Sequence, residues 1–337
     1  MSDANYQKGR DDNVKEFNER KAKQYDEMIK FSGVLLANSL LRYKTSNHVT
    51  DSNKIYKTKE NVLPELNENL PLFPKDKPIK ILDFACGTGF IAEILAPYLS
   101  KDSELYGIDI SENQLNLFNN RSNEIKLKYP ILKEFQGKPF DILDNKFNTD
   151  KNYLKPEWLI ENSFDIIYCS YSYHHFPDPD KFTNILSKYL KKNGYFIILD
   201  FYDKEYEELG GNDIDQTHSH SHSHDDSHSH SHSHGHSHSH SHSHSGDGAH
   251  SHAVSHSGGI PPAELAAMLE SAGLVSAEHG IAFRFEDWFN EKSVMNHMPP
   301  RAAEMIKTTR PTRVNASSGA NEYLFPRAVV FAAAQRP

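Results

Sequence analysis

The segment best suited to hold a cofactor is 82–89, which reads Leu-Asp-Phe-Ala-Cys-Gly-Thr-Gly and continues a short apolar stretch. Gly87 and Gly89 have no Cβ, so the backbone there can turn sharply and approach a ligand closely. Residues 87–92 also match the G-x-G-x-x-A spacing of dinucleotide-binding loops, although so short a match is a weak signal by itself. A strand that runs into such a turn predicts a cofactor site at its carboxyl end.

Two acidic residues help to decide which cofactor this loop would bind. Asp83 lies four positions before the first glycine, where its carboxylate would repel a pyrophosphate bound at the start of the following helix. The same carboxylate would attract a cofactor that carries an ammonium group and a sulfonium centre but no phosphate. Asp109 ends the next apolar stretch and could accept hydrogen bonds from both ribose hydroxyls of either adenosine cofactor. Asp83 therefore favours S-adenosylmethionine over a nicotinamide dinucleotide.

The candidate catalytic residues are His174 and His175, which follow the apolar stretch 164–170. An unperturbed histidine titrates near pH 6.5 and can accept a proton at neutral pH. We favour His175 as a general base; the alternative is that one histidine caps or packs the loop while the other contacts the cofactor. Tyr25 either closes over the cofactor as part of an N-terminal lid or belongs to an amphipathic helix docked on the sheet.

The segment 218–256, here called the histidine tract, alternates serine with histidine and holds 16 of the 21 histidines. We expect it to be disordered, because it has almost no apolar surface to bury. Imidazoles at a spacing of two could bind Zn, Ni or Cu, and the candidate ligands are His228, His230, His232 and His234. The tract could gate the substrate pocket in response to metal or pH. Composition also shifts across it from lysine-rich to alanine-rich, which we interpret as drift rather than as a fusion joint.

Composition narrows the class of protein further. The 337 residues carry a formal net charge of −9 and a pI near 6.1, which argues against nucleic acid or an anionic membrane as the main partner. Only two cysteines occur, so a disulfide framework is excluded. The longest apolar run, 31–41, is about half the length needed to cross a bilayer. We expect a cytoplasmic protein that acts on a small molecule; nothing in the sequence indicates its oligomeric state.

Short apolar stretches alternate with helical ones over most of the chain, which predicts a doubly wound α/β sheet with parallel strands buried on both faces. The expected strands are 79–84, 104–110, 131–136, 164–170, 194–201, 274–285 and 323–335. The expected helices are 12–30, 31–45, 90–99, 112–128, 179–192 and 261–273. A long connection, 286–322, separates the last two strands.

The glycine segment resembles the first motif of class I S-adenosylmethionine-dependent methyltransferases. Phe17 with residues 22–26, and the helix around Glu264–Gly273, are similar to the small-molecule branch related to ubiquinone-biosynthesis and fungal stress-response enzymes. In that family the backbone at Ala85 and Gly87 lines the methionine part of the cofactor, and Asp83 anchors its amino group. By the same resemblance Asp109 binds the ribose and Asp141 meets the adenine amino group. The implied cofactor-binding set is Tyr25, Asp83, Ala85, Gly87, Gly89, Asp109, Ile110, Asp141, Ile142 and Ser170.

The resemblance implies a Rossmann-like sheet of seven strands, mostly parallel with an antiparallel final strand, and an N-terminal helical extension. Residues 1–75 would form a helical lid and linker, and 76–337 the methyltransferase domain, interrupted by the histidine tract. The expected activity is in-line displacement of a methyl group from S-adenosylmethionine to a small molecule. The alternatives are a histidine-rich metal-binding protein that uses such a fold as a carrier, and an NAD-dependent oxidoreductase.

Overall fold

The fold was obtained as a computed structural model. It describes residues 3–16, 19–48, 54–57, 62–129, 132–143, 154–203, 255–256, 258–298, 300–316 and 318–337. All but two residues of the histidine tract, including the four candidate metal ligands in it, lie outside these ranges.

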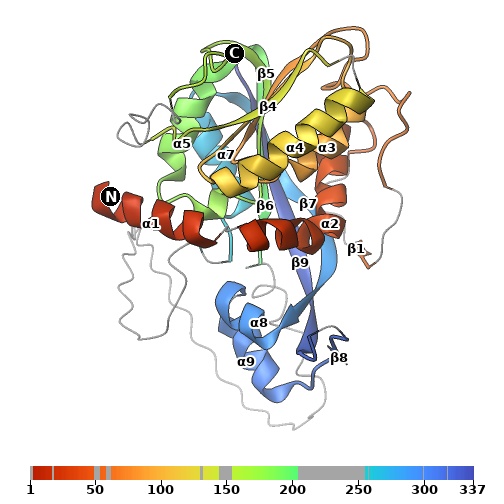
Figure 1. The fold of residues 1–337 in the computed structure, drawn as a ribbon, viewed down its shortest axis with the longest axis vertical. Coiled ribbons are helices and arrows are strands. Elements are labelled where there is room, and N and C mark those ends of the chain that lie inside the picture. Colours follow the sequence, from red (N-terminus) through yellow and green to blue (C-terminus); the bar gives the residue numbers. More distant parts are fainter. Residues whose placement is uncertain are drawn as a thin grey trace, which may run out of the picture.

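A single mixed sheet organises the molecule (Figure 1). Its main strands are β2 (Lys80–Phe84), β3 (Glu104–Asp109), β4 (Glu134–Pro139), β5 (Phe164–Ser170), β6 (Leu190–Phe201), β7 (Val275–Asn290) and β9 (Asn321–Gln335). They lie in the order β7-β9-β6-β5-β2-β3-β4, and β9 runs antiparallel to both β6 and β7. The predicted arrangement of seven strands with an antiparallel final strand is therefore confirmed. Two short strands add to it, β1 (Ile55–Tyr56) beside β7 and β8 (Arg313–Val314) beside β9.

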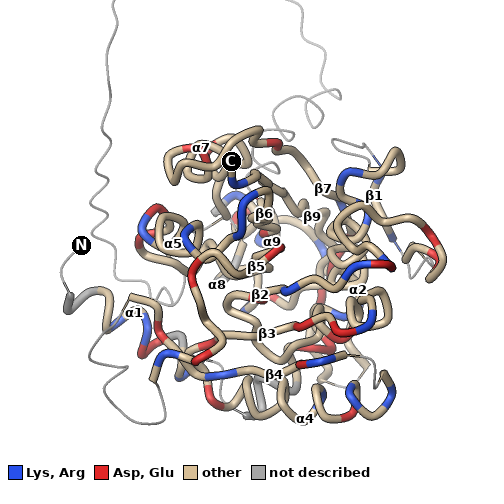
Figure 2. The backbone as a smooth tube through the Cα atoms, turned by 90° about the horizontal axis from the view of Figure 1, so that it is seen from above, with Lys and Arg blue, Asp and Glu red and all other residues tan. Residues whose placement is uncertain are grey.

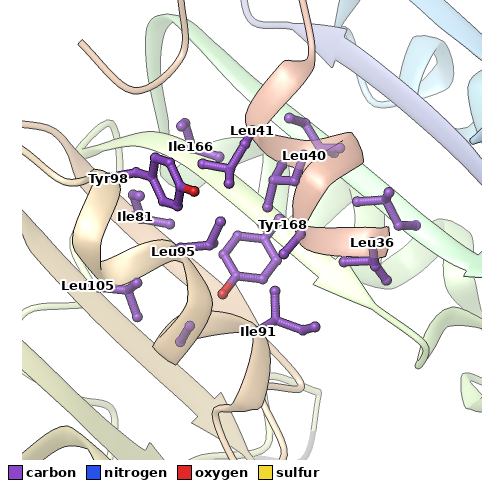
Figure 3. Packing of buried hydrophobic residues seen from close by; sticks show 14 of the residues in the cluster. Leu36, Leu40, Leu41, Ile81, Ile91, Leu95, Tyr98, Leu105, Ile166 and Tyr168 are labelled. Atoms are coloured by element: carbon purple, nitrogen blue, oxygen red, sulfur yellow. The ribbon is translucent and has the colours of Figure 1, made fainter. Parts of the chain in front are cut away.

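Helices cover both faces of the sheet. One face carries α2 (Glu19–Arg42), α3 (Phe90–Leu95) and α4 (Glu112–Lys128), and the other carries α5 (Pro179–Leu186) and α7 (Pro262–Ser271). Figure 3 shows Leu36, Leu40 and Leu41 of α2 packed over the sheet beside Ile91 and Leu95 of α3. Because α2 buries its leucines in the same core as the strands, it is a structural layer of this fold as well as a cover for its edge. The shorter α1 (Asp3–Glu16) lies to the left of α2 in Figure 1.

The long connection before the last strand is folded. Strands β7 and β9 continue beyond the rest of the sheet and carry α8 (Glu291–His297) and α9 (Pro300–Thr308), which lie at the bottom of Figure 1. This extension has an apolar core of its own, formed by Phe289, Val294, Met298, Ala302, Ile306, Tyr323 and Phe325. The predicted strand 274–285 therefore ended five residues early, because Phe289 is buried by this second core rather than by the main one.

Other element bounds also differ from the expectation. The predicted helix 179–192 is wrong at its end: α5 stops at Leu186, one 3₁₀ turn follows, and β6 begins at Leu190. Asn193, with a φ of 62°, bends the start of β6, so a strand with a local irregularity looked like a turn between two elements. In the N-terminal region, α2 spans the boundary expected between 12–30 and 31–45.

Two global properties agree with the composition. Acidic and basic residues lie interspersed on the helices around the sheet in Figure 2. None of the helices in the described ranges is both long enough and apolar enough to cross a membrane.

The topology also fixes where a ligand would bind. From β2 the chain moves to β3 on one side, whereas β5 pairs with β2 on the other side. The carboxyl end of β2 is therefore the point at which the strand order reverses, and open α/β sheets form their crevice at such a point. The glycine loop follows directly from this end of β2.

Candidate active site

A pocket opens at the carboxyl ends of β2, β3 and β5, where α1 and α2 cover the edge of the sheet. The space within it is about 1100 Å³, a volume that includes its open mouth and the adjoining solvent. Nine of the residues expected from the sequence line it: Tyr25, Ala85, Gly87, Asp109, Ile110, Asp141, Ile142, Ser170 and His175. The remaining three, Asp83, Gly89 and His174, lie behind or beside its wall.

The glycine loop turns through backbone conformations that favour glycine. Ala85, Gly87 and Gly89 have φ values of 56°, 53° and 77°. The positive φ of Gly87 favours glycine, and a Cβ built there would lie 2.4 Å from Oε1 of Gln114, whose side chain would have to move. Gly89 precedes the first residue of α3, and its missing Cβ makes room for the ring of Phe118 instead of for a ligand. Its role in this structure is to let the helices pack closely.

Asp83 is a buried carboxylate directly behind this loop, with only 1% of its surface exposed. The Tyr168 hydroxyl donates to Oδ2 at 2.7 Å, whereas Oδ1 accepts no hydrogen bond from the described residues. Burial raises the pKa of Asp83 to about 8, against the smaller opposing effect of the Tyr168 hydrogen bond. A buried carboxylate with one unsatisfied oxygen is unusual in a folded protein and suits a cationic ligand group.

Asp109 ends β3 and lines the pocket. Its Oδ2 accepts a hydrogen bond from the Gly87 backbone N–H and its Oδ1 from that of Ser111, both at 2.8 Å. Burial raises its pKa, while the backbone N–H groups act in the opposite direction. These bonds fix the carboxylate in place and leave lone pairs for the hydroxyls of a ligand. Gln114 on α4 also lines the pocket, and its Oε1 has no partner among the described residues.

Asp141 lines the pocket together with its apolar chain neighbours Phe140 and Ile142. Its Oδ1 accepts hydrogen bonds from the Leu143 backbone N–H at 2.9 Å and from the Tyr6 hydroxyl at 2.7 Å. Tyr6 belongs to α1, so the first helix reaches the same carboxylate that the family resemblance assigns to adenine. Sequence reasoning missed Tyr6, because nothing in the charged N-terminal segment marks it as different from a surface residue.

An ionic cluster holds α2 over the glycine loop. Arg121 of α4 contacts Asp26 at 2.6 Å and Glu93 of α3 at 2.6 Å, and it also donates to the Thr88 carbonyl. The Thr88 hydroxyl in turn donates to Asp26. Because Asp26 follows Tyr25, this cluster places Tyr25 on the pocket wall, where burial and the Asp200 carboxylate raise the pKa of its hydroxyl.

The two adjacent histidines have different surroundings. They form a 3₁₀ turn after β5, and their rings lie 4.1 Å apart between centroids. His175 lines the pocket. His174 points instead to Asp200 at the end of β6, with Nδ1 2.8 Å from Oδ1 of that carboxylate. The last part of the histidine tract reaches this turn, because the backbone N–H of His256 donates to the His174 carbonyl at 2.9 Å.

The candidate metal ligands His228, His230, His232 and His234 lie outside the described residues. Within the described part of the chain, no group of three or more His, Cys, Asp or Glu side chains has the arrangement of a metal site.

Comparison with known proteins bears on these assignments. Residues 75–250 match a family described as a methyltransferase domain. An uncharacterized methyltransferase of Schizosaccharomyces pombe is 29% identical over 197 residues, 56% of this chain and 63% of the relative. The ubiquinone biosynthesis O-methyltransferase of Pelagibacter ubique is 28% identical over 146 residues, 42% of this chain and 49% of the relative. The chain thus matches less than two thirds of the length of either relative. A crystal structure of YcgJ from Bacillus subtilis covers 77% of this chain and 93% of its own, with 16% identity and a TM-score of 0.41.

Proposed function

The chain belongs to the methyltransferase-domain family, and from that premise we propose that it transfers a methyl group from S-adenosylmethionine to a small-molecule acceptor bound in the pocket described above. The observation that carries the proposal is Asp83. A buried carboxylate with an unsatisfied oxygen, placed behind a glycine loop, is suited to the amino group of this cofactor.

The remaining pocket residues fit the other parts of the same cofactor. Asp109 is held by two backbone N–H groups with lone pairs left over, which suits the ribose hydroxyls. Asp141 lines the pocket beside the apolar residues Phe140 and Ile142, which suits the amino group and faces of an adenine. Ala85 and Gly87 bring the backbone against the space between them, where the methionine part would lie. We assign Ile110, Ile142, Ser170 and Tyr25 to the walls of this site.

A nicotinamide dinucleotide fits the same pocket less well. Its pyrophosphate would lie at the start of α3 near the Asp109 carboxylate, and Arg121, the basic side chain that contacts the glycine loop, is already paired with Asp26 and Glu93. An ammonium and a sulfonium have the opposite sign, so they gain from the charge of Asp109 and favour the ionised form of Asp83.

Bound S-adenosylmethionine would supply a methyl group on a positively charged sulfur, which is already activated for displacement. The contribution of the protein is then mainly positional. Holding two reactants in line can account for about 7–11 kcal/mol of a barrier. Asp83 and Asp109 would fix one reactant, while Phe84 and Phe176 give the pocket apolar walls that keep water from the reacting atoms.

A small acceptor agrees with the cover over the pocket. Helices α1 and α2 lie across its edge, and the Arg121 cluster fixes α2 there, which leaves little room for a folded protein or a nucleic acid duplex. A relative named for ubiquinone biosynthesis and O-methylation gives further support for a small acceptor.

Calorimetric titration tests the proposal directly. Wild-type protein, Asp83→Ala and the control Asp165→Asn would each be titrated with S-adenosylmethionine, S-adenosylhomocysteine and NADH. Asp165 is a matched control because it is a partly buried carboxylate at the opposite end of β5, bonded to Lys191. We expect binding of both adenosyl ligands to the wild type and the control, loss of binding in Asp83→Ala, and no binding of NADH. Tight binding of NADH, or unchanged binding in Asp83→Ala, would overturn the assignment.

A further inference from the structure

One buried carboxylate near the pocket has a geometry that the binding of the cofactor does not explain. Asp200, at the end of β6, has no exposed surface. Its Oδ2 accepts from the His174 backbone N–H, and its Oδ1 accepts from the Phe201 backbone N–H, both at 2.8 Å. Oδ1 also lies 2.8 Å from Nδ1 of the His174 ring. The carboxylate is thus held by two backbone donors in the one position where it can orient this imidazole.

This arrangement determines which nitrogen of the ring carries the proton. A carboxylate that accepts from backbone N–H groups at both oxygens is an acceptor toward Nδ1 as well, so Nδ1 is the donor. In the neutral ring Nε2 then has a free lone pair. No described residue makes a hydrogen bond to Nε2, because every hydrogen bond of the His174 side chain within the described part goes to Asp200. The His174 side chain is 15% exposed, whereas Asp200 is fully buried.

The imidazole is also close to the site. The His174 ring packs against the ring of His175, which lines the pocket, and the two follow Ser170 at the end of β5. Tyr25 also lines the pocket, and after burial the Asp200 charge is the largest cause that raises the pKa of its hydroxyl. The dyad of His174 and Asp200 therefore lies at the carboxyl end of β5, next to the histidine that lines the pocket.

The other ionisable groups around the dyad come from each neighbouring element. Tyr25 faces it from α2, His175 from its own turn, and Arg327 from β9. The Arg327 charge is engaged by Asp203, with two contacts of 2.9 and 2.7 Å. The side chain of His256 comes from the end of the histidine tract. Asp200 is thus the carboxylate that contacts the ring directly.

We propose that Asp200 is a positioning residue that fixes His174 as the proton acceptor for a hydroxyl-bearing methyl acceptor, with His175 shaping the wall. This inference rests on the proposed function. The acceptor oxygen gives its proton to Nε2 of His174 and forms the new bond to the methyl carbon. The electron pair of the broken carbon–sulfur bond remains on the sulfur, which becomes a neutral thioether, and the imidazolium is stabilised by Asp200. Proton transfer of this kind contributes about 10²–10⁴-fold to rate.

The tautomer of His174 can be read in the full-length protein by ¹⁵N NMR with labelled histidine. The His174 signals are assigned by their loss in His174→Gln. We expect Nδ1 to carry the proton and Nε2 to be unprotonated at pH 8. In Asp200→Asn the side-chain amide can donate to Nδ1, so the proton should move to Nε2. A wild-type ring protonated at Nε2, or an Asp200→Asn ring with an unchanged tautomer, would overturn the inference.

The chemical consequence is tested with methyl-labelled S-adenosylmethionine and a deproteinised yeast extract as the source of acceptors. We expect label on oxygen atoms of small molecules, formed 10²–10⁴-fold more slowly by Asp200→Asn and by His174→Gln, and at the wild-type rate by Asp165→Asn. His174→Gln keeps the test available if Asp200→Asn does not fold. Label found on carbon, or at equal rates in wild type and Asp200→Asn, would contradict the role of the dyad.

Calorimetry separates this inference from the proposed function. If S-adenosylhomocysteine does not bind to the wild type, the proposed function fails whatever the tautomer of His174. If it binds with equal affinity to wild type and Asp200→Asn, and the tautomer does not depend on Asp200, only the role of the dyad fails.

Discussion

Replacing Asp83 by asparagine should make the ligand-free protein more stable near neutral pH while it removes the cofactor site. The folded pKa of Asp83 is raised by burial from 3.8 to about 8. Between these two values the folded state keeps a proton that the unfolded state has lost. The free energy of unfolding therefore falls as pH rises through this range. Asparagine is neutral at every pH and can still accept the hydrogen bond from Tyr168, so the variant escapes this cost.

The size of the effect follows from the shift. Each pH unit between the two pKa values changes the free energy of unfolding by about 1.4 kcal/mol. Over the two units from pH 5 to pH 7, the stability of Asp83→Asn relative to the wild type should thus increase by roughly 3 kcal/mol. Urea unfolding of both proteins at pH 5, 6 and 7 measures it, and the comparison cancels the titration of all other groups. A difference that stays constant with pH, or one that favours the wild type more at pH 7 than at pH 5, would refute the reasoning.

The ionisation of Asp83 should also be measurable as proton release when a ligand binds. At pH 7 about nine in ten Asp83 side chains of the free protein carry a proton if their pKa is about 8. Binding of an ammonium group favours the ionised carboxylate, so binding of S-adenosylhomocysteine should release close to one proton. Calorimetry at pH 7 in two buffers of different ionisation enthalpy gives this number. Release of no proton by the wild type would contradict the placement of the amino group beside Asp83.

Three substitutions and a deletion test the rest of the site. Gly87→Ala places a Cβ at a positive φ and against Gln114. It should destabilise the fold by about 1–3 kcal/mol and weaken S-adenosylhomocysteine binding more than tenfold. An unaltered affinity in calorimetry would argue against a role of the glycine loop in binding. Arg121→Met removes charged hydrogen bonds between α4 and α2, and should lower the unfolding free energy by about 1–3 kcal/mol in urea titrations; no change would show that the cluster does not hold α2. Tyr6→Phe removes the hydroxyl that occupies Asp141, and should tighten S-adenosylhomocysteine binding by about 2–10-fold; weaker binding would show that the hydroxyl assists the ligand. Deletion of the histidine tract should abolish zinc binding measured by equilibrium dialysis, and an unchanged affinity for S-adenosylhomocysteine with and without zinc would exclude a gating role for the tract.

The sequence predicted best those elements whose local residue pattern matches their place in the folded protein. The strand 164–170 and the helix 112–128 were predicted with the bounds that the structure shows. An apolar strand buried on both faces, and a helix that begins after the capping serine Ser111, each have a clear local signature. The glycine loop was recognisable for the same reason, because its glycines and its position directly after a strand both reflect the sharp backbone turn at that point.

The residues that were missed depend on tertiary contacts. Tyr6 is separated from its partner Asp141 by 135 positions, and neither residue indicates the other in the sequence. Asp200 was counted only as the end of a strand, because its importance lies in a bond to a residue on another loop. The α8–α9 extension was read as an undefined connection, since its small core takes residues from both β7 and β9.

The central claim is that this chain moves a methyl group from S-adenosylmethionine to a small molecule, and transfer of label tests it most directly. Wild-type protein and Asp83→Ala would be incubated with methyl-labelled S-adenosylmethionine and an extract separated into small-molecule, protein and nucleic-acid fractions. We predict that labelled methyl groups enter the small-molecule fraction with the wild type only. Label that enters the protein or nucleic-acid fraction, or that stays entirely on the donor, would contradict the account.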